Sequence, residues 1–183
     1  MARYVLTDQP YVARLVRQNL DENRPSSPRR PPARSRKARP AAAAAGGADP
    51  PAPPGDQDAA KLAFAPLDWE TDQVGPSLTG SPAHESFDAV IACDCIYNDA
   101  LVEPLVQTCA DACRLRSRDG GQRPPNPCLC IVAQQLRNPD VFEAWLEAFH
   151  ARFRVWQLPD ALLSPGLRVG SGFAVHLGVL RET

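Results

Sequence analysis

The stretch FDAVIACDCIY, residues 87–97, joins an apolar run to an acidic residue and an aromatic hydroxyl. The apolar run 87–93 lacks polar alternation, which is typical of a strand buried on both faces. Asp94 follows at the carboxyl end of this strand, and Tyr97 comes one helical turn later. Because open α/β sheets bind ligands beyond the carboxyl ends of their strands, this placement predicts a functional site at Asp94 and Tyr97.

Strand-like and helix-like segments follow one another on both sides of this stretch. Their order is strand–helix–strand–strand–helix–strand–helix–strand–strand, which predicts an α/β protein with a doubly wound, Rossmann-like sheet. Asn98 or Asp99, and later Asn138 before Pro139, are suitable residues to begin the second and third helices. The last two strands are expected to pair antiparallel. The expected strands are 4–8, 61–65, 87–93, 128–134, 154–158 and 173–180.

Residues 24–60 differ in composition from the rest of the 183-residue chain. They are rich in proline, arginine and alanine and have almost no large apolar side chains to offset their ordering entropy. We therefore expect a disordered insertion at 24–60 that divides one core into residues 1–23 and 61–183.

Charge is distributed unevenly along the chain. Residues 24–40 hold seven of the twenty Arg and Lys and no acid, so the remainder carries 13 basic and 21 acidic residues. A basic arm on an acidic body could make weak contact with RNA, a ribosome surface or an import receptor, or could be merely a solvated insertion. No stretch approaches the roughly 18 apolar residues of a membrane span, and the N-terminus does not resemble a signal peptide. We expect a cytoplasmic or nuclear protein.

The six cysteines form three closely spaced pairs. Two pairs have Cys-x-Cys spacing in strand-like runs, and the third has i, i+4 spacing on a helix, whereas zinc sites favour knuckles on loops. We expect reduced, buried thiols that act as small hydrophobes and no metal site. The three histidines share no spacing that would place them in one site. The cysteines are Cys93, Cys95, Cys109, Cys113, Cys128 and Cys130, and the histidines are His84, His150 and His176.

Three motifs occur at the ends of successive strands. They are Thr7-Asp8 with a following helix that contains Asn19, then Leu67-Asp68-Trp69, then Asp94-Cys95-Ile96-Tyr97. In this order they resemble the seven-β-strand protein-lysine methyltransferases of family 16, in particular the fungal ribosomal lysine methyltransferase 5 type. The resemblance implies a Rossmann-like methyltransferase sheet, S-adenosylmethionine as cofactor, and a protein substrate that presents a lysine, with a ribosomal protein or translation factor as the expected class.

The resemblance also implies roles for individual residues. Asp8 would accept the ribose hydroxyls of the cofactor, and Trp69 and Cys93 would lie beside the cofactor. Asp94 and Tyr97 would line the channel for the acceptor lysine. Each has a simpler alternative: Asp8 and Asp94 as acids at helix N-termini, Trp69 as a core aromatic and Tyr97 as an ordinary packed tyrosine.

The chain departs from this family at its beginning. Family members carry a first strand and a Glu-x-Gly-x-Gly loop before the Thr-Asp strand, and Met1 leaves no room for them. We therefore expect an N-terminally incomplete methyltransferase sheet that lacks its first strand and glycine-rich loop. Two functions remain open, a protein-lysine methyltransferase impaired by truncation and a non-catalytic protein-binding module derived from one.

Overall fold

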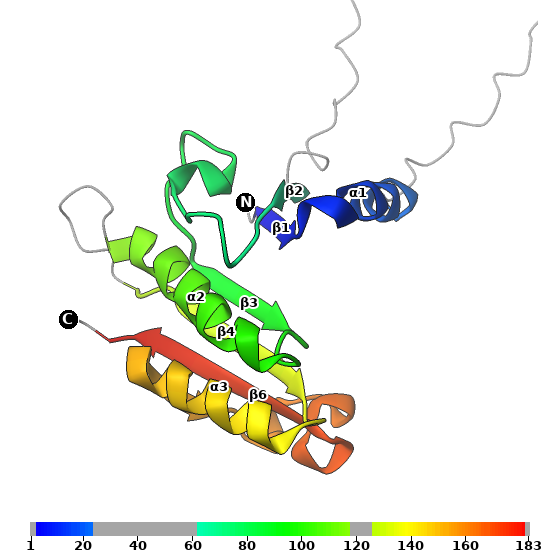
Figure 1. Ribbon diagram of the computed structural model, residues 1–183, viewed down its shortest axis with the longest axis vertical. Coiled ribbons are helices and arrows are strands. Elements are labelled where there is room, and N and C mark those ends of the chain that lie inside the picture. The colour runs from blue at the N-terminus through cyan, green and yellow to red at the C-terminus, as the bar shows by residue number, and fades with distance from the viewer. Residues whose placement is uncertain (1–2, 24–61, 118–125, 182–183) are drawn as a thin grey trace, which may run out of the picture.

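The computed structural model describes residues 3–23, 62–117 and 126–181 (Figure 1). Strands and helices alternate, which confirms the α/β class. The predicted insertion at 24–60 lies outside the described residues. In chain order the elements are β1 (Tyr4–Asp8), α1 (Ala13–Glu22), β2 (Leu62–Pro66), β3 (Ala89–Cys93), α2 (Val102–Ser117), β4 (Leu129–Gln135), α3 (Pro139–Arg152), β5 (Phe153–Gln157) and β6 (Phe173–Leu180).

The strands form two separate sheets. β1 and β2 pair in parallel as a two-stranded ribbon, and the other four strands follow the order β3-β4-β6-β5. β3 and β4 are parallel, whereas β6 is antiparallel to both β4 and β5, so the predicted antiparallel pairing of the last two strands is confirmed. A single sheet is not formed by the described residues, because β1 and β3 do not pair with each other. The missing first strand stays a prediction.

Helices α2 and α3 lie side by side against the four-stranded sheet (Figure 1). Their apolar faces share one core cluster with β3 and β4, which includes Val106, Cys130, Val132, Trp145 and Phe149. The two helices therefore cover the same face of the sheet, whereas a doubly wound sheet has helices on both faces. None of the helices in the described part of the chain combines the length and apolar character needed to cross a lipid bilayer.

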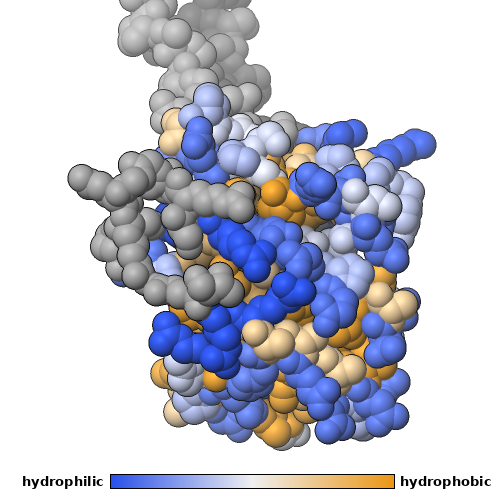
Figure 2. All heavy atoms as spheres, turned by 60° about the vertical axis from the view of Figure 1, so that its left-hand side comes forward, coloured by the Kyte–Doolittle hydropathy of each residue, from blue (hydrophilic) through white to orange (hydrophobic). Residues whose placement is uncertain are grey.

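The central apolar run was expected to be buried on both faces, and this expectation is wrong. Ala89, Ile91 and Cys93 are exposed, with Ile91 at 60% of its full exposure, while Val90 and Ala92 face the core. The reason is that β3 is an edge strand, bonded to β4 alone within the described residues. Apolar side chains also reach the surface elsewhere, as Figure 2 shows for one side of the molecule.

The starts of α2 and α3 agree with the sequence. The side chain of Asn98 accepts a hydrogen bond from the Ala100 amide at 3.1 Å, at the beginning of the short 3-10 turn that leads into α2. Asn138 accepts hydrogen bonds from the Asp140 amide at 3.0 Å and the Val141 amide at 3.4 Å. Both asparagines therefore satisfy backbone donors that have no partner within the helix.

The cysteines are all free thiols, and four of them lie in the core. Cys109 and Cys113 on α2 meet Cys128 and Cys130 at β4. Hydrogen bonding to Cys109 and Cys113, together with burial, raises the pKa of the Cys130 thiol, which keeps it protonated. Cys93 corrects the expectation that all six are buried, because it is exposed on the uncovered side of β3.

Candidate functional site

Asp94 lies where β3 ends and is the one non-glycine residue with positive φ in the described part of the chain, at 55°. Its backbone amide still donates to the Ala133 carbonyl at 2.8 Å, so the turn begins directly at the end of the β3–β4 ladder. A side chain in this left-handed conformation costs about 1–2 kcal/mol, although aspartate tolerates it better than most residues. Such strained residues concentrate at functional sites.

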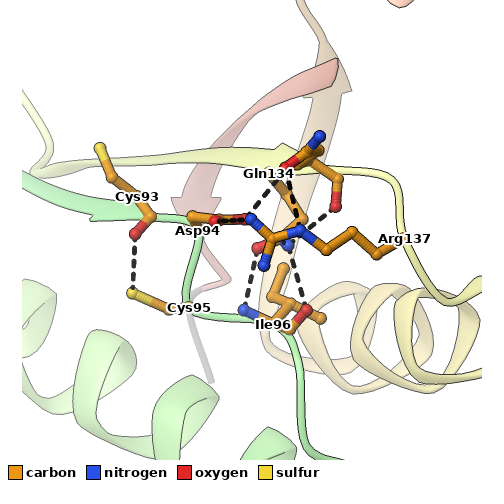
Figure 3. Close-up of polar contacts among 7 residues, drawn as sticks. Cys93, Asp94, Cys95, Ile96, Gln134 and Arg137 are labelled. Atoms are coloured by element: carbon orange, nitrogen blue, oxygen red, sulfur yellow. Dashed lines mark hydrogen bonds and ion pairs between the residues drawn. The ribbon is translucent and has the colours of Figure 1, made fainter. Parts of the chain in front are cut away.

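The Asp94 carboxylate contacts residues that follow β4 (Figure 3). Its Oδ1 accepts hydrogen bonds from Gln134 Nε2 at 3.0 Å and from the Gln135 amide at 3.4 Å. Its Oδ2 forms an ion pair with the guanidinium of Arg137 at 2.5 Å. Asp94 thus connects the ends of two parallel strands, while Asn98 caps the helix that follows.

Gln134 is a site residue that the sequence reasoning missed. It is 1% exposed, and its amide holds the loop after β3 by accepting from the Ile96 amide at 2.8 Å and donating to the Ile96 carbonyl at 3.0 Å. A signal was present in the alternation along β4: Cys130, Val132 and Gln134 all face the core. A glutamine in such a series indicates a buried polar group that requires partners.

Tyr97 does not lie one helical turn after Asp94, as the sequence suggested. Residues 95–98 form a loop rather than a helix, because the 3-10 turn begins only at Asp99. The Tyr97 side chain is 60% exposed, so it is not an ordinary packed tyrosine. Nearby, the thiol of Cys95 donates to the Cys93 carbonyl at 3.4 Å (Figure 3).

Asp8 and Trp69 come from the two-stranded ribbon and the segment after it. Asp8 ends β1, where its Oδ1 accepts from the Gln9 amide at 2.7 Å, while its carbonyl accepts from the Leu67 amide at 2.9 Å. The Asp8 motif and the Leu67-Asp68-Trp69 motif are therefore adjacent. Trp69 also packs against the core cluster, so its alternative as a core aromatic is supported.

The charge of Asp8 reaches the loop that follows Asp94. Burial raises the pKa of the Cys95 thiol to about 11, and the negative charge of Asp8 contributes in the same direction. The carboxyl ends of β1 and β3 thus lie on the same side of the molecule although the strands do not pair. The exposed carboxylate of Asp8 and the half-buried indole of Trp69 are suited to a ligand with hydroxyl groups and an aromatic ring.

An open hollow of about 370 Å³ lies beside the end of β2. It is lined by Pro66, Leu67, Asp72 and Ser77, among others, and therefore borders the motif that precedes Trp69 rather than Asp94. Among the described residues, no group of three or more His, Cys, Asp or Glu side chains is arranged to hold a metal ion.

Residues 55–118 match a family model described as lysine methyltransferase. The matched stretch includes β2, the Leu67-Asp68-Trp69 motif, β3, Asp94, Tyr97 and α2, and it covers about a third of the chain. No curated protein matches the sequence. The match supports the predicted methyltransferase family for this part of the chain, and proteins of that family normally use S-adenosylmethionine.

Proposed function

We propose that the protein is an S-adenosylmethionine-dependent protein-lysine N-methyltransferase that acts on a ribosomal or translation-related protein. One observation carries the proposal: the stretch that matches the lysine methyltransferase model contains Asp94, the strained acidic residue at the carboxyl end of β3. The proposal extends from methyltransferase to protein-lysine specificity because a carboxylate is suited to a cationic acceptor.

Asp8, Trp69 and Cys93 are the proposed cofactor contacts. S-adenosylmethionine supplies, when bound, a methyl group activated by an adjacent sulfonium. The Asp8 carboxylate would accept its ribose hydroxyls, and the indole of Trp69 would give an apolar face for the adenine or sulfonium region. The exposed position of Cys93, next to Asp94, would place it between the two halves of the site.

Asp94 and Tyr97 are the proposed catalytic residues. Methyl transfer is an in-line displacement, so the protein contributes chiefly alignment of the acceptor. The lysine amine must lose its proton before it can attack, since an ammonium has no lone pair. Asp94 and the exposed hydroxyl of Tyr97 would hold the amine on its line of attack while the proton leaves to solvent.

A second candidate is a non-catalytic protein-binding module. It is favoured by the ion pair between Asp94 and Arg137, which already occupies the carboxylate proposed for the acceptor. Such a module would bind a basic segment of a partner protein through this acidic residue without transferring a methyl group. The cytoplasmic or nuclear location and the weak RNA contact through residues 24–40 remain part of either proposal.

Calorimetric titration with S-adenosylmethionine tests the proposed function. We expect a dissociation constant of about micromolar for the full chain and loss of binding in Asp8→Ala. The matched control is Glu143→Ala, which removes an exposed carboxylate from α3 and should bind as the unchanged protein does. Absence of binding by a folded chain would contradict the enzyme and leave the binding module. Transfer is then measured as added methyl mass on synthetic lysine peptides from ribosomal proteins.

A further inference from the structure

We propose that Arg137 determines acceptor specificity: its guanidinium occupies the Asp94 carboxylate until a cationic side chain replaces it. This inference deepens the proposed function and rests on it, since it concerns the same acceptor site. It requires that the carboxylate be reachable from solvent, that the guanidinium can be exchanged, and that Asp94 can change partners at little cost.

The two oxygen atoms of Asp94 have different surroundings (Figure 3). Oδ1 faces the end of β4 and the buried amide of Gln134, whereas Oδ2 faces Arg137. The side chains of the ion pair are 38% exposed at Asp94 and 55% exposed at Arg137. A cation arriving from solvent can therefore reach the side of the carboxylate that the guanidinium now occupies.

Arg137 is held in place by a second polar contact. Its Nε donates to Gln135 Oε1 at 2.9 Å, and it lies in the short link between β4 and α3. An ion pair with this exposure is screened by water and salt and changes an equilibrium by about five-fold at most. A lysine ammonium of the same charge can compete at that cost.

The amide of Gln134 makes the exchange possible without an unpaired buried donor. Its Nε2 lies near three acceptors, namely Asp94 Oδ1 at 3.0 Å, the Ile96 carbonyl at 3.0 Å and the Gln135 carbonyl at 2.9 Å. Because an amide nitrogen has two hydrogens, two acceptors suffice. Asp94 can thus rotate toward a new partner while both backbone carbonyls keep Gln134 satisfied.

The consequence is selection by charge. A neutral hydroxyl or thiol group cannot replace a guanidinium on a carboxylate, because the loss of the charge-assisted hydrogen bond would not be compensated. An ammonium forms a bond of the same kind and also fits a point charge without the planar geometry that arginine requires. Arg137 would therefore reject neutral acceptors and admit lysine.

The test is a titration of the full chain, labelled with ¹⁵N, followed through the backbone amides of Ile96 and Gln135 at low salt. The probes are n-butylammonium, which reproduces the lysine side chain, and n-butanol, its neutral counterpart. We expect the amine to act at two- to five-fold lower concentration on Arg137→Gln than on the unchanged protein, and to have no effect on Asp94→Asn. n-Butanol should cause no shift in any form.

Arg152→Gln is the matched control, because it removes the same charge from the far end of α3, where Arg152 faces Glu103 at 3.6 Å. It should leave the amine titration unchanged. Equal amine affinity in Arg137→Gln and the unchanged protein, or equal effects of the two probes, would overturn the role of Arg137. If the amine result holds while S-adenosylmethionine does not bind, the enzyme proposal fails and the charge exchange stands.

Discussion

Two regions of the molecule differ sharply in how much they bury. In β1, α1 and β2 no residue is buried, and large apolar side chains such as Tyr4 and Leu15 are more than half exposed. In the four-stranded region Trp145, Phe149 and Phe153 are at most 1% exposed. Since burial of apolar area is the main stabilising contribution, the four-stranded region must supply most of the stability.

The candidate site draws on both regions. Asp94, Gln134 and Arg137 belong to the well-packed region, whereas Asp8 belongs to the ribbon that is held chiefly by strand pairing. The proposed acceptor contacts are therefore held by a rigid core, and the proposed cofactor contacts lie on the less stable part. Four predictions test this difference, from the largest expected effect to the smallest.

The same substitution in the two regions should have unequal consequences. Phe149 is fully buried and stacks on Trp145 at 5.0 Å and Phe153 at 4.4 Å between ring centroids, so Phe149→Ala should lower the free energy of unfolding by about 3–5 kcal/mol. Phe64 on β2 is half-buried beneath the guanidinium of Arg17, and Phe64→Ala should cost about 1 kcal/mol. Urea unfolding measures both, and equal losses would disprove the comparison.

The site in the packed region should depend on its buried amide. Gln134→Leu removes the partners of the Ile96 amide and carbonyl and should lower the free energy of unfolding by about 1–3 kcal/mol. Gln135→Leu is the control, because that side chain is half-buried and bonds to the exposed Arg137, so its loss should cost less than about 1 kcal/mol. A larger effect of the control would show that Gln134 does not hold the loop.

Close packing of β6 against α3 should show at a single glycine. A Cβ on Gly178 would lie 2.5 Å from Phe149 Cζ and 3.1 Å from Phe153 Cδ1, so the stacked rings must move. Gly178→Ala should therefore cost about 1–3 kcal/mol in thermal or urea unfolding. Gly170→Ala, where no heavy atom lies within 4 Å, should change stability little. A tolerated Gly178→Ala would mean that this core is less tightly packed than described.

The smallest effect should come from pH. His176 packs beside the rings of Phe142 and Trp145, and burial, followed by the charge of His150, lowers its pKa below 6.5. The unfolded chain then binds the proton more readily, so stability should fall as pH decreases from 6.5 toward the lowered pKa, by about 1 kcal/mol.

Comparison of variants isolates this contribution from that of the carboxylates. Unfolding at pH 7.5 and at pH 5 should differ less in His176→Phe than in the unchanged protein. His84→Gln, in a loop, should retain the full difference. The same pH dependence in all three forms would place the titration elsewhere.

The sequence by itself determined the features that arise between neighbouring residues. The strands are close to their expected positions, and Asn98 and Asn138 begin their helices, because an asparagine cap needs only the next two or three amides of the chain. It also placed Asp94 at the end of a strand, since the apolar run stops there.

Only the tertiary structure decided which distant residues meet. Gln134 and Arg137 follow Asp94 by 40 and 43 residues, so no local pattern could assign them to its carboxylate. The exposure of β3 depends likewise on which strands lie beside it: an apolar run with no alternation has the same sequence at an edge as in the middle of a sheet. Local hydrogen bonds are specified by nearby residues, whereas burial and charge pairing are specified by the partners that folding brings together.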